Sequence, residues 1–258
     1  MNDLKTKIRN RELSVGSWLS FADLQIAEMM ATAGFEWLVV DMEHTSTSVS
    51  EMRALIQVVS LAGAAPFVRV GANDPLLIKR ALDAGSLGIV VPMVNSPDEA
   101  RAAVDSVYYP PKGLRGVGLA RAQKYGEGFD EYRTGQEDQL SLFVQIEHYR
   151  AVEQLDAIMA VDGVDGFIVG PYDLSGSLGV PGQFDHPKVV EALAEVARYA
   201  AAGAKPAGMH VVHSDPERLQ GCIDAGYRFI AYGTEMIFLS EKLKETAATL
   251  KAIGPVTR

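Results

Sequence analysis

Short runs of β-branched and aromatic residues alternate along the chain with segments in which apolar residues recur at helical spacing. No linker rich in Pro, Gly and Ser interrupts this alternation, which is typical of a parallel α/β fold. We therefore expect one domain that spans residues 1–258. The eight predicted strands are Leu13–Leu19, Trp37–Asp41, Pro66–Val70, Gly88–Pro92, Leu142–Ile146, Gly166–Val169, Lys205–His210 and Arg228–Ala231.

Polar residues at helix starts and glycines at helix ends support these boundaries. Ser48 with Glu51, and Ser96 with Glu99, fit a capping box, and Pro97 suits the first turn of a helix. Three more starts are predicted at Asp74-Pro75, His186-Pro187 and Asp215-Pro216. Left-handed helix ends are predicted at Gly63, Gly85, Gly203 and Gly226.

Eight strands separated by helices can close into a barrel or lie open as a doubly wound sheet. The length of 258 residues is close to that of one barrel, and no GxGxxG motif follows the first strand. We therefore predict a (β/α)8 TIM barrel. In this fold the loops after the carboxyl ends of the strands build the functional site.

Composition limits the classes of partner. The formal net charge is -9, and the basic residues are scattered, which argues against a nucleic-acid or anionic-membrane surface. Cys222 is the single cysteine and cannot form an internal disulfide. The first ten residues do not resemble a secretory signal, and no apolar run approaches the roughly 20 residues of a membrane span. We expect a cytoplasmic protein with small-molecule partners.

The predicted strand ends carry a set of polar and ionisable residues. Asp and His also favour loops and helix caps, so any one of them alone is weak support for function. The set comprises Trp18, Ser20, Asp41, Glu43, His44, Arg69, Gln145, Glu147, His148, Asp173 and His210.

Glu147 and Asp173 follow two consecutive predicted strands. Neighbouring strands lie about 4.8 Å apart, so the two carboxylates can converge on one divalent cation, which would relieve their repulsion. Two oxygen ligands with open positions suit Mg²⁺, Mn²⁺ or Co²⁺ better than Zn²⁺. The competing interpretations are helix capping by Asp173 and a surface ion pair for Glu147. The predicted barrel mouth contains no lysine for a Schiff base, which favours metal-assisted chemistry.

Five motifs follow one another along the chain, namely DMEH at 41–44, FVR at 67–69, YPPKGLRGVG at 109–118, QIE at 145–147 and GPYDLS at 170–175. These motifs and their order closely resemble the HpcH/HpaI aldolase family of class II pyruvate aldolases. The resemblance runs from about Gly16 to the final helix, which is far more specific than a lone short pattern.

The resemblance implies a metal-dependent aldolase that cleaves or forms 4-hydroxy-2-oxo acids through a metal-stabilised pyruvate enolate. It implies that Glu147 and Asp173 are the metal ligands and that Arg69 contacts the oxo-acid oxygens. It also implies that His44, paired with Asp41, serves acid–base catalysis through a water. The partners are then a 2-oxo acid and an aldehyde. We expect the substrate pocket to involve Trp18, Gln145, Pro171, Tyr172, His210 and Val211.

Family members resembling this chain form homohexamers, as trimers of dimers, in which the last helix is exchanged between barrels. Thr234–Leu250 is the candidate for that helix.

Departures from the family pattern leave the aldehyde open. The loop at 119–129 reads LARAQKYGEGF, Tyr172 replaces a smaller residue, and His210 stands where an apolar residue often lines the pyruvate pocket. His210, Arg121, Lys124 or Tyr125 are candidates for contact with a polar or anionic tail. Two alternatives remain, namely an oxaloacetate-type decarboxylase on the same site and a non-catalytic 2-oxo acid sensor.

Overall fold

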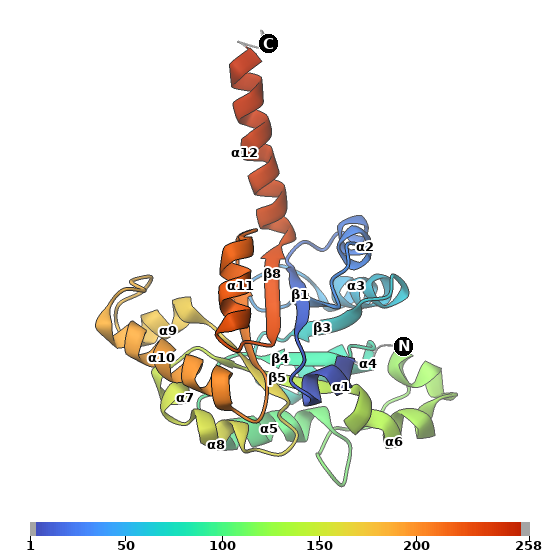
Figure 1. Cartoon of the computed structure of the whole chain (residues 1–258). Coiled ribbons are helices and arrows are strands. Elements are labelled where there is room, and N and C mark those ends of the chain that lie inside the picture. The colour runs from blue at the N-terminus through green and yellow to red at the C-terminus, as the bar shows by residue number, and fades with distance from the viewer. Residues whose placement is uncertain (1–3, 254–258) are drawn as a thin grey trace.

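The computed structural model describes residues 4–253, and its eight strands form one closed parallel barrel in the order β1 to β8 (Figure 1). The predicted TIM barrel is therefore confirmed. The strands are β1 Ser14–Leu19, β2 Trp37–Asp41, β3 Ala65–Arg69, β4 Gly88–Val91, β5 Ser141–Ile146, β6 Gly166–Val169, β7 Ala207–Val211 and β8 Phe229–Thr234.

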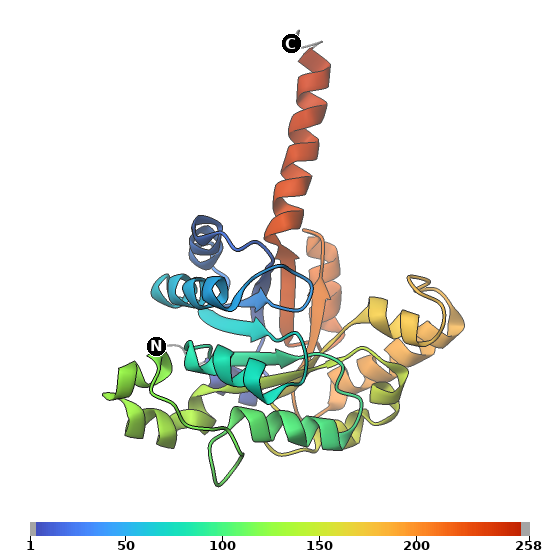
Figure 2. The ribbon, with the colours of Figure 1, turned by 180° about the vertical axis from the view of Figure 1, so that it is seen from behind.

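Helices connect the strands around the outside of the barrel, except at the two ends of the chain. The helix α1 precedes the first strand, and α12 follows the last strand and extends away from the barrel by itself (Figures 1 and 2). The helices are α1 Leu4–Arg9, α2 Leu24–Thr32, α3 Val49–Leu61, α4 Pro75–Asp83, α5 Pro97–Val107, α6 Phe129–Gln139, α7 Tyr149–Glu153, α8 Leu155–Met159, α9 Pro171–Ser177, α10 Pro187–Ala202, α11 Pro216–Asp224 and α12 Glu235–Ile253, with a short 3-10 helix η1 at Arg121–Gly126. Among residues 4–253, none of these helices has the length and apolar character needed to cross a membrane.

All eight predicted strands are present, with small differences at their ends. The seventh begins at Ala207 and not at Lys205, because Pro206 between them has no N–H to donate to a neighbouring strand. The eighth continues beyond Ala231 to Thr234. This extension brings the start of α12 directly to the end of β8.

The helix signals are largely confirmed. Ser48 and Glu51 form both halves of the predicted capping box. At α5, Ser96 accepts from the N–H of Glu99, but the Glu99 carboxylate accepts from the N–H of Asn95 in place of that of Ser96.

One glycine has a different role from the predicted one. Gly203 was expected to end its helix in the left-handed region, but its φ is -63°. A Cβ at this position would come within 2.2 Å of the Tyr199 ring. Close packing against the Tyr199 ring, and not a positive φ, therefore requires glycine at position 203. Gly63, Gly85 and Gly226 do have a positive φ, as predicted.

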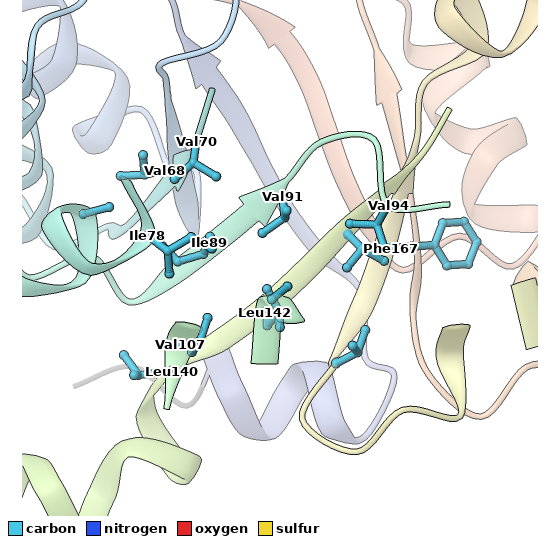
Figure 3. Packing of buried hydrophobic residues seen from close by; sticks show 14 of the residues in the cluster. Val68, Val70, Ile78, Ile89, Val91, Val94, Val107, Leu140, Leu142 and Phe167 are labelled. Carbon is cyan, nitrogen blue, oxygen red and sulfur yellow. The ribbon is translucent and has the colours of Figure 1, made fainter. Parts of the chain in front are cut away.

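The apolar side chains form two layers because successive strand residues point to opposite faces. Inside the barrel, Trp37 and Phe143 both stack on Phe229, each with ring centroids 3.9 Å apart. Leu4 and Ile8 of α1, a helix that the sequence pattern did not predict, pack with this inner layer. The outer layer lies between strands and helices (Figure 3).

The same alternation decides which residues face the mouth of the barrel. Positions an even number of residues further along the same strand again point inward, at the carboxyl ends of the strands. They include Trp18, Asp41, Arg69, Gln145 and His210. Of the polar residues predicted at the strand ends, Asp41, Arg69, Gln145 and His210 thus belong to the inner surface of the mouth.

Candidate active site

Arg69 occupies a fixed position at the end of β3. Its Nε donates to Asp41 Oδ1 at 2.9 Å, and its Nη2 donates to Asp41 Oδ2 at 2.7 Å. The register pairs Asp41 with Arg69 on adjacent strands, so the two side chains are opposite one another. The indole of Trp18 lies against the guanidinium, with the Arg69 carbon 4.5 Å from the ring centroid. A bidentate ion pair and a cation–π contact together restrict Arg69 to one orientation.

A hydrogen-bond relay leads from Arg69 to Glu147. Arg69 Nη1 donates to Gln145 Oε1 at 3.4 Å, and Gln145 Nε2 donates to Glu147 Oε2 at 2.7 Å. The other carboxylate oxygen of Glu147 accepts from the backbone N–H of Met93 at 2.6 Å. Met93 has a φ of 54°, which is a strained value for a non-glycine residue. The strained turn after β4 therefore serves to aim an N–H at Glu147.

Glu147 is a carboxylate in a largely dry environment, with 3% of its surface exposed. Burial raises its pKa to about 7, the Met93 hydrogen bond opposes this shift, and the negative charges of Glu43 and Asp173 add to it. The protein thus holds Glu147 where a negative charge is costly unless a cation is near.

Asp173 lies close enough to Glu147 for its negative charge to raise the pKa of Glu147. It stands in the first turn of α9, just after Gly170, and Ile146 of β5 pairs with Val169 of β6 directly before the two acidic residues. Its side chain is exposed at the mouth. Glu147 and Asp173 therefore come from adjacent strand ends, as the sequence predicted.

The donor set fits a hard divalent cation. Two carboxylates supply oxygen ligands, and a cation would offset both the burial and the carboxylate repulsion that raise the pKa of Glu147. Within residues 4–253 no group of three or more His, Cys, Asp and Glu side chains gathers to hold a metal. A pair of carboxylates leaves coordination positions for water and for substrate oxygens.

The expected side-chain pair between Asp41 and His44 is replaced by another arrangement. The Asp41 carboxylate is engaged by Arg69 and accepts from the backbone N–H groups of Glu43 and His44. The His44 ring is 66% exposed, and its Nε2 lies 3.9 Å from Glu43 Oε2. Asp41 therefore shapes the loop that carries His44 and fixes Arg69, but it does not orient the imidazole.

Glu43 is a site residue to which sequence reasoning assigned no role. Its Oε2 lies 3.1 Å from Arg69 Nη1 and is otherwise a buried oxygen without a hydrogen bond in the described chain. Burial raises its pKa, while the charge of Arg69 lowers it. Its position two residues after Asp41, in the DMEH motif, was the available signal.

Trp18 and His210 form the wall of the mouth next to Arg69. Their ring centroids are 5.7 Å apart with an angle of 43° between the planes. His210 Nε2 lies 3.2 Å from the carbonyl oxygen of Gly233. The indole N–H of Trp18 is buried and has no acceptor among residues 4–253. This wall therefore combines apolar ring faces with unused hydrogen-bonding capacity.

Four other predicted residues lie in different surroundings. Pro171 begins α9, and Tyr172 is exposed with its ring 4.9 Å from that of Phe184 at the rim. Val211 is fully buried in the outer layer, on the face opposite to His210, so it does not line the mouth. His148 is the N-cap of α7 and accepts from the N–H of Arg150.

The loop at 119–129 lies at the other end of the barrel. Arg121 donates to the carbonyl of Ala84, which precedes β4, and Lys124 pairs with Glu131 of α6. Residues 122, 124 and 128 line a cavity together with Leu4 of α1. The prediction that Arg121, Lys124 or Tyr125 contacts the aldehyde is therefore wrong for the mouth of the same chain.

Comparison with known sequences identifies relatives over almost the whole chain. The model of the HpcH/HpaI aldolase/citrate lyase family matches residues 14–241. The 2-keto-3-deoxy-L-rhamnonate aldolase of Salmonella typhi is 36% identical over 258 residues, which cover 99% of this chain and 96% of that protein.

Solved structures of similar sequence share the fold. An HpcH/HpaI aldolase/citrate lyase family protein from Burkholderia cenocepacia J2315 has a TM-score of 0.91 and 33% identity, over 97% of this chain and 100% of that one. An HpcH/HpaI aldolase from Desulfitobacterium hafniense DCB-2 has a TM-score of 0.88 and 31% identity, over 99% of both chains.

Gly170 provides a test of how the Glu147 carboxylate is positioned. A Cβ at residue 170 would come within 2.8 Å of Glu147 Cβ and 2.9 Å of its Oε2. We expect Gly170→Ala to displace the carboxylate and to weaken Mn²⁺ binding by about 10- to 100-fold, as loss of a supporting contact commonly does. Isothermal titration of the metal measures this. Gly176→Ala, on the same helix with open space around it, is the matched control, and equal affinities in both variants would contradict the assignment.

The raised pKa of Glu147 predicts a pH-dependent stability in metal-free protein. A folded-state pKa above the ordinary value favours folding at low pH, and this stabilisation is lost as the pH rises from about 4.5 to about 7. Relative to Glu147→Gln, which cannot ionise, the wild type should lose on the order of 2–3 kcal/mol between pH 5 and pH 8. Urea unfolding with a chelator measures the difference. The exposed-site variant Glu127→Gln retains Glu147 and should therefore follow the pH course of the wild type, and a parallel pH course for Glu147→Gln and wild type would refute the prediction.

Proposed function

The chain belongs to the HpcH/HpaI aldolase/citrate lyase family, and on this premise we propose that its barrel mouth cleaves and forms 4-hydroxy-2-oxo acids. Its relatives over 99% of its length are aldolases, so the chain is an enzyme of the carbon–carbon lyase class. The observation that carries the more specific proposal is the buried Glu147, with a raised pKa, beside Asp173 and the fixed Arg69.

A divalent metal is the cofactor of this family, and we propose that Glu147 and Asp173 hold it as Mg²⁺, Mn²⁺ or Co²⁺. When bound, such a cation stabilises negative charge that develops on the oxygens of the 2-oxo acid. The rest of the chemistry falls to the side chains around it. Glu147 is kept ready for this role by Gln145 and the N–H of Met93, which fix both of its oxygens.

Arg69 binds the oxo-acid end of the substrate in this proposal. A guanidinium keeps its charge at all relevant pH values, and here its direction is set by Asp41 and by the Trp18 ring. Because these contacts exist before substrate arrives, little reorganisation is needed when charge develops in the transition state.

His44 is the proposed base for cleavage. It would remove the proton of the C4 hydroxyl, directly or through water, while the oxygen electron pair forms the aldehyde carbonyl. The C3–C4 bond then breaks, its electron pair converts the 2-oxo acid into an enolate, and a proton added at C3 completes the 2-oxo acid product. The exposure of His44 at the rim supports proton exchange with solvent.

The relatives narrow the substrate class. The curated relatives carry the name 2-keto-3-deoxy-L-rhamnonate aldolase, and that name describes a 2-oxo acid with hydroxyl groups beyond C3. We propose a substrate of this 3-deoxy sugar-acid class for the present chain. An oxaloacetate-type decarboxylase and a non-catalytic sensor are less well supported, since the relatives are aldolases.

We further propose that α12 packs on a second copy of the chain. Its exposed apolar residues recur at intervals of three, four and seven, which produces a stripe along one side. They are Met236, Leu239, Leu243, Leu250 and Ile253.

The barrel itself shows where a partner helix fits. The helix α11 is amphipathic but has no buried residue, and Met29 of α2 is 71% exposed. These helices lie against β7 and β2, so they flank β8 and β1, from which α12 departs (Figures 1 and 2). An exchanged α12 from the partner would cover this place, and three such dimers would form the expected homohexamer.

The catalytic proposal predicts metal-dependent exchange of the C3 protons of pyruvate in deuterated water. Glu147→Ala and Asp173→Ala should each lower the exchange rate by more than about 100-fold through loss of metal, because each removes a ligand. Arg69→Ala should instead raise the KM for pyruvate while metal remains bound. NMR detection of exchange, combined with metal titration, separates these effects. Undiminished exchange in the metal-free double variant Glu147→Ala/Asp173→Ala would reject the proposed site.

The exchange of α12 predicts that the oligomer depends on its apolar stripe. Leu243→Glu should shift the molar mass from that of an oligomer towards that of a monomer, since it places a charge in the proposed interface. Size-exclusion chromatography with light scattering measures the mass. Lys244→Glu introduces the same side chain at the neighbouring position, off the stripe, and should leave the assembly intact. A monomeric wild type would contradict the proposal.

A further inference from the structure

His210 is an unusual residue for the inner surface of this barrel mouth. It lies at the end of β7, paired with Ala231 of the inner layer, and two residues beyond Gly208. Its ring lies beside that of Trp18, with centroids 5.7 Å apart, and the charge of Arg69 reaches it. A titratable side chain is thus built into the wall next to the residue proposed to bind the oxo acid.

The contact with Gly233 fixes the tautomer of His210. A carbonyl oxygen can only accept, so Nε2, which lies 3.2 Å from it, must carry the proton. Burial lowers the pKa of His210 to about 4, the Gly233 hydrogen bond opposes this shift, and the charge of Arg69 adds to it. The ring is therefore neutral near pH 7, and its Nδ1 presents a lone pair.

This lone pair is available to a ligand. Nδ1 makes no hydrogen bond to any residue from 4 to 253, and it is not one of the fully buried polar atoms, so it keeps access to solvent. An aromatic nitrogen with a lone pair accepts from O–H or N–H and has nothing to donate. A hydroxyl group satisfies it, whereas a carboxylate is repelled.

The charges around His210 also disfavour an anionic tail. Arg69 contacts Asp41 and Glu43 and is assigned above to the oxo-acid end of the substrate, and Glu147 and Asp173 add further negative charge to the mouth. Arg121 and Lys124, which the sequence offered as cations for such a tail, lie at the opposite end of the barrel.

We propose that His210 determines substrate specificity by accepting, through Nδ1, a hydrogen bond from an aliphatic hydroxyl of the substrate, and that it excludes a carboxylate from this place. This inference rests on the proposed aldolase function. Because C3 carries no hydroxyl in the 3-deoxy class proposed above, the expected source is the carbon next to the carbonyl of the acceptor aldehyde. The alternative source, C3 of a hydroxylated 2-oxo acid donor, would place the substrate outside that class.

Matched substrate pairs test the inference and separate the two sources. The acceptor pair is 2-hydroxypropanal and propanal, each with pyruvate, and the donor pair is hydroxypyruvate and pyruvate, each with propanal. The kcat/KM of aldol addition should favour the hydroxylated member of one pair by about tenfold or more, because a substrate without the hydroxyl would cover Nδ1 and leave it without the donor that solvent supplies in the free enzyme. The pair that shows the preference identifies the source.

Variants of His210 establish that this residue causes the preference. His210→Leu should reduce the ratio within that pair to near one, while His210→Asn should restore much of it, since an amide oxygen can replace Nδ1. The histidine His148, which caps α7 outside the proposed machinery, supplies the control His148→Asn, with an unchanged ratio. An undiminished ratio in His210→Leu would overturn the proposal.

Two independent measurements complete the test. Nitrogen NMR of labelled imidazole should show a neutral ring protonated at Nε2, and a ring protonated at Nδ1 would contradict the assignment. Butanal should react better than 4-oxobutanoate, its carboxylated analogue, and the reverse order would also contradict it. If pyruvate C3 exchange occurs without any hydroxyl preference, this inference alone fails, whereas absence of metal-dependent exchange in the wild type refutes the proposed function as well.

Discussion

The ion pair between Asp41 and Arg69 is the interaction on which the rest of the mouth depends. It is bidentate and mostly buried, and Trp18, Gln145 and Glu43 contact the same guanidinium. A buried charge is tolerated only when its partner and its remaining hydrogen-bonding groups are satisfied. Loss of Asp41 would leave Arg69 without its main anchor, and the relay to Glu147 through Gln145 would lose its starting point.

The barrel gives this network its accuracy because almost every member stands on a strand. Side chains two residues apart point to the same face, so Glu147, the first residue after β5, continues the inward row of Gln145. Two residues outside the strands make room for Glu147 and hold it. Gly170 leaves room for its carboxylate, and Met93 takes a strained conformation to donate an N–H to it. Such local strain beside a buried carboxylate is typical of a site in which stability has been given up for function.

The parts of this site that follow from strand order could be predicted from the sequence. The side-chain partners that tertiary contacts determine could not. Strand periodicity and order sufficed for the eight strands and for bringing the ends that precede Glu147 and Asp173 next to each other. The side chain that pairs with Asp41 could not be predicted from strand order. His44 is near in sequence, but Arg69 is opposite Asp41 in the register, and only the closed barrel reveals that. The prediction that Val211 lines the substrate pocket was wrong because consecutive strand residues point to opposite faces, and Val211 directly follows His210.

The wall of the mouth and the projecting helix are connected through Glu235. This residue begins α12, is buried, and accepts from the backbone N–H groups of Ser20 and Phe21, two and three residues after Trp18. Burial raises its pKa, while these hydrogen bonds lower it. The segment that positions Trp18 is therefore tied to the base of α12. Since Trp18 packs on both Arg69 and His210, an α12 anchored on a second copy would also steady the wall against which substrate binds. Assembly and substrate recognition then share one structural connection, although the proposed docking place of α12 lies on the outside of the barrel.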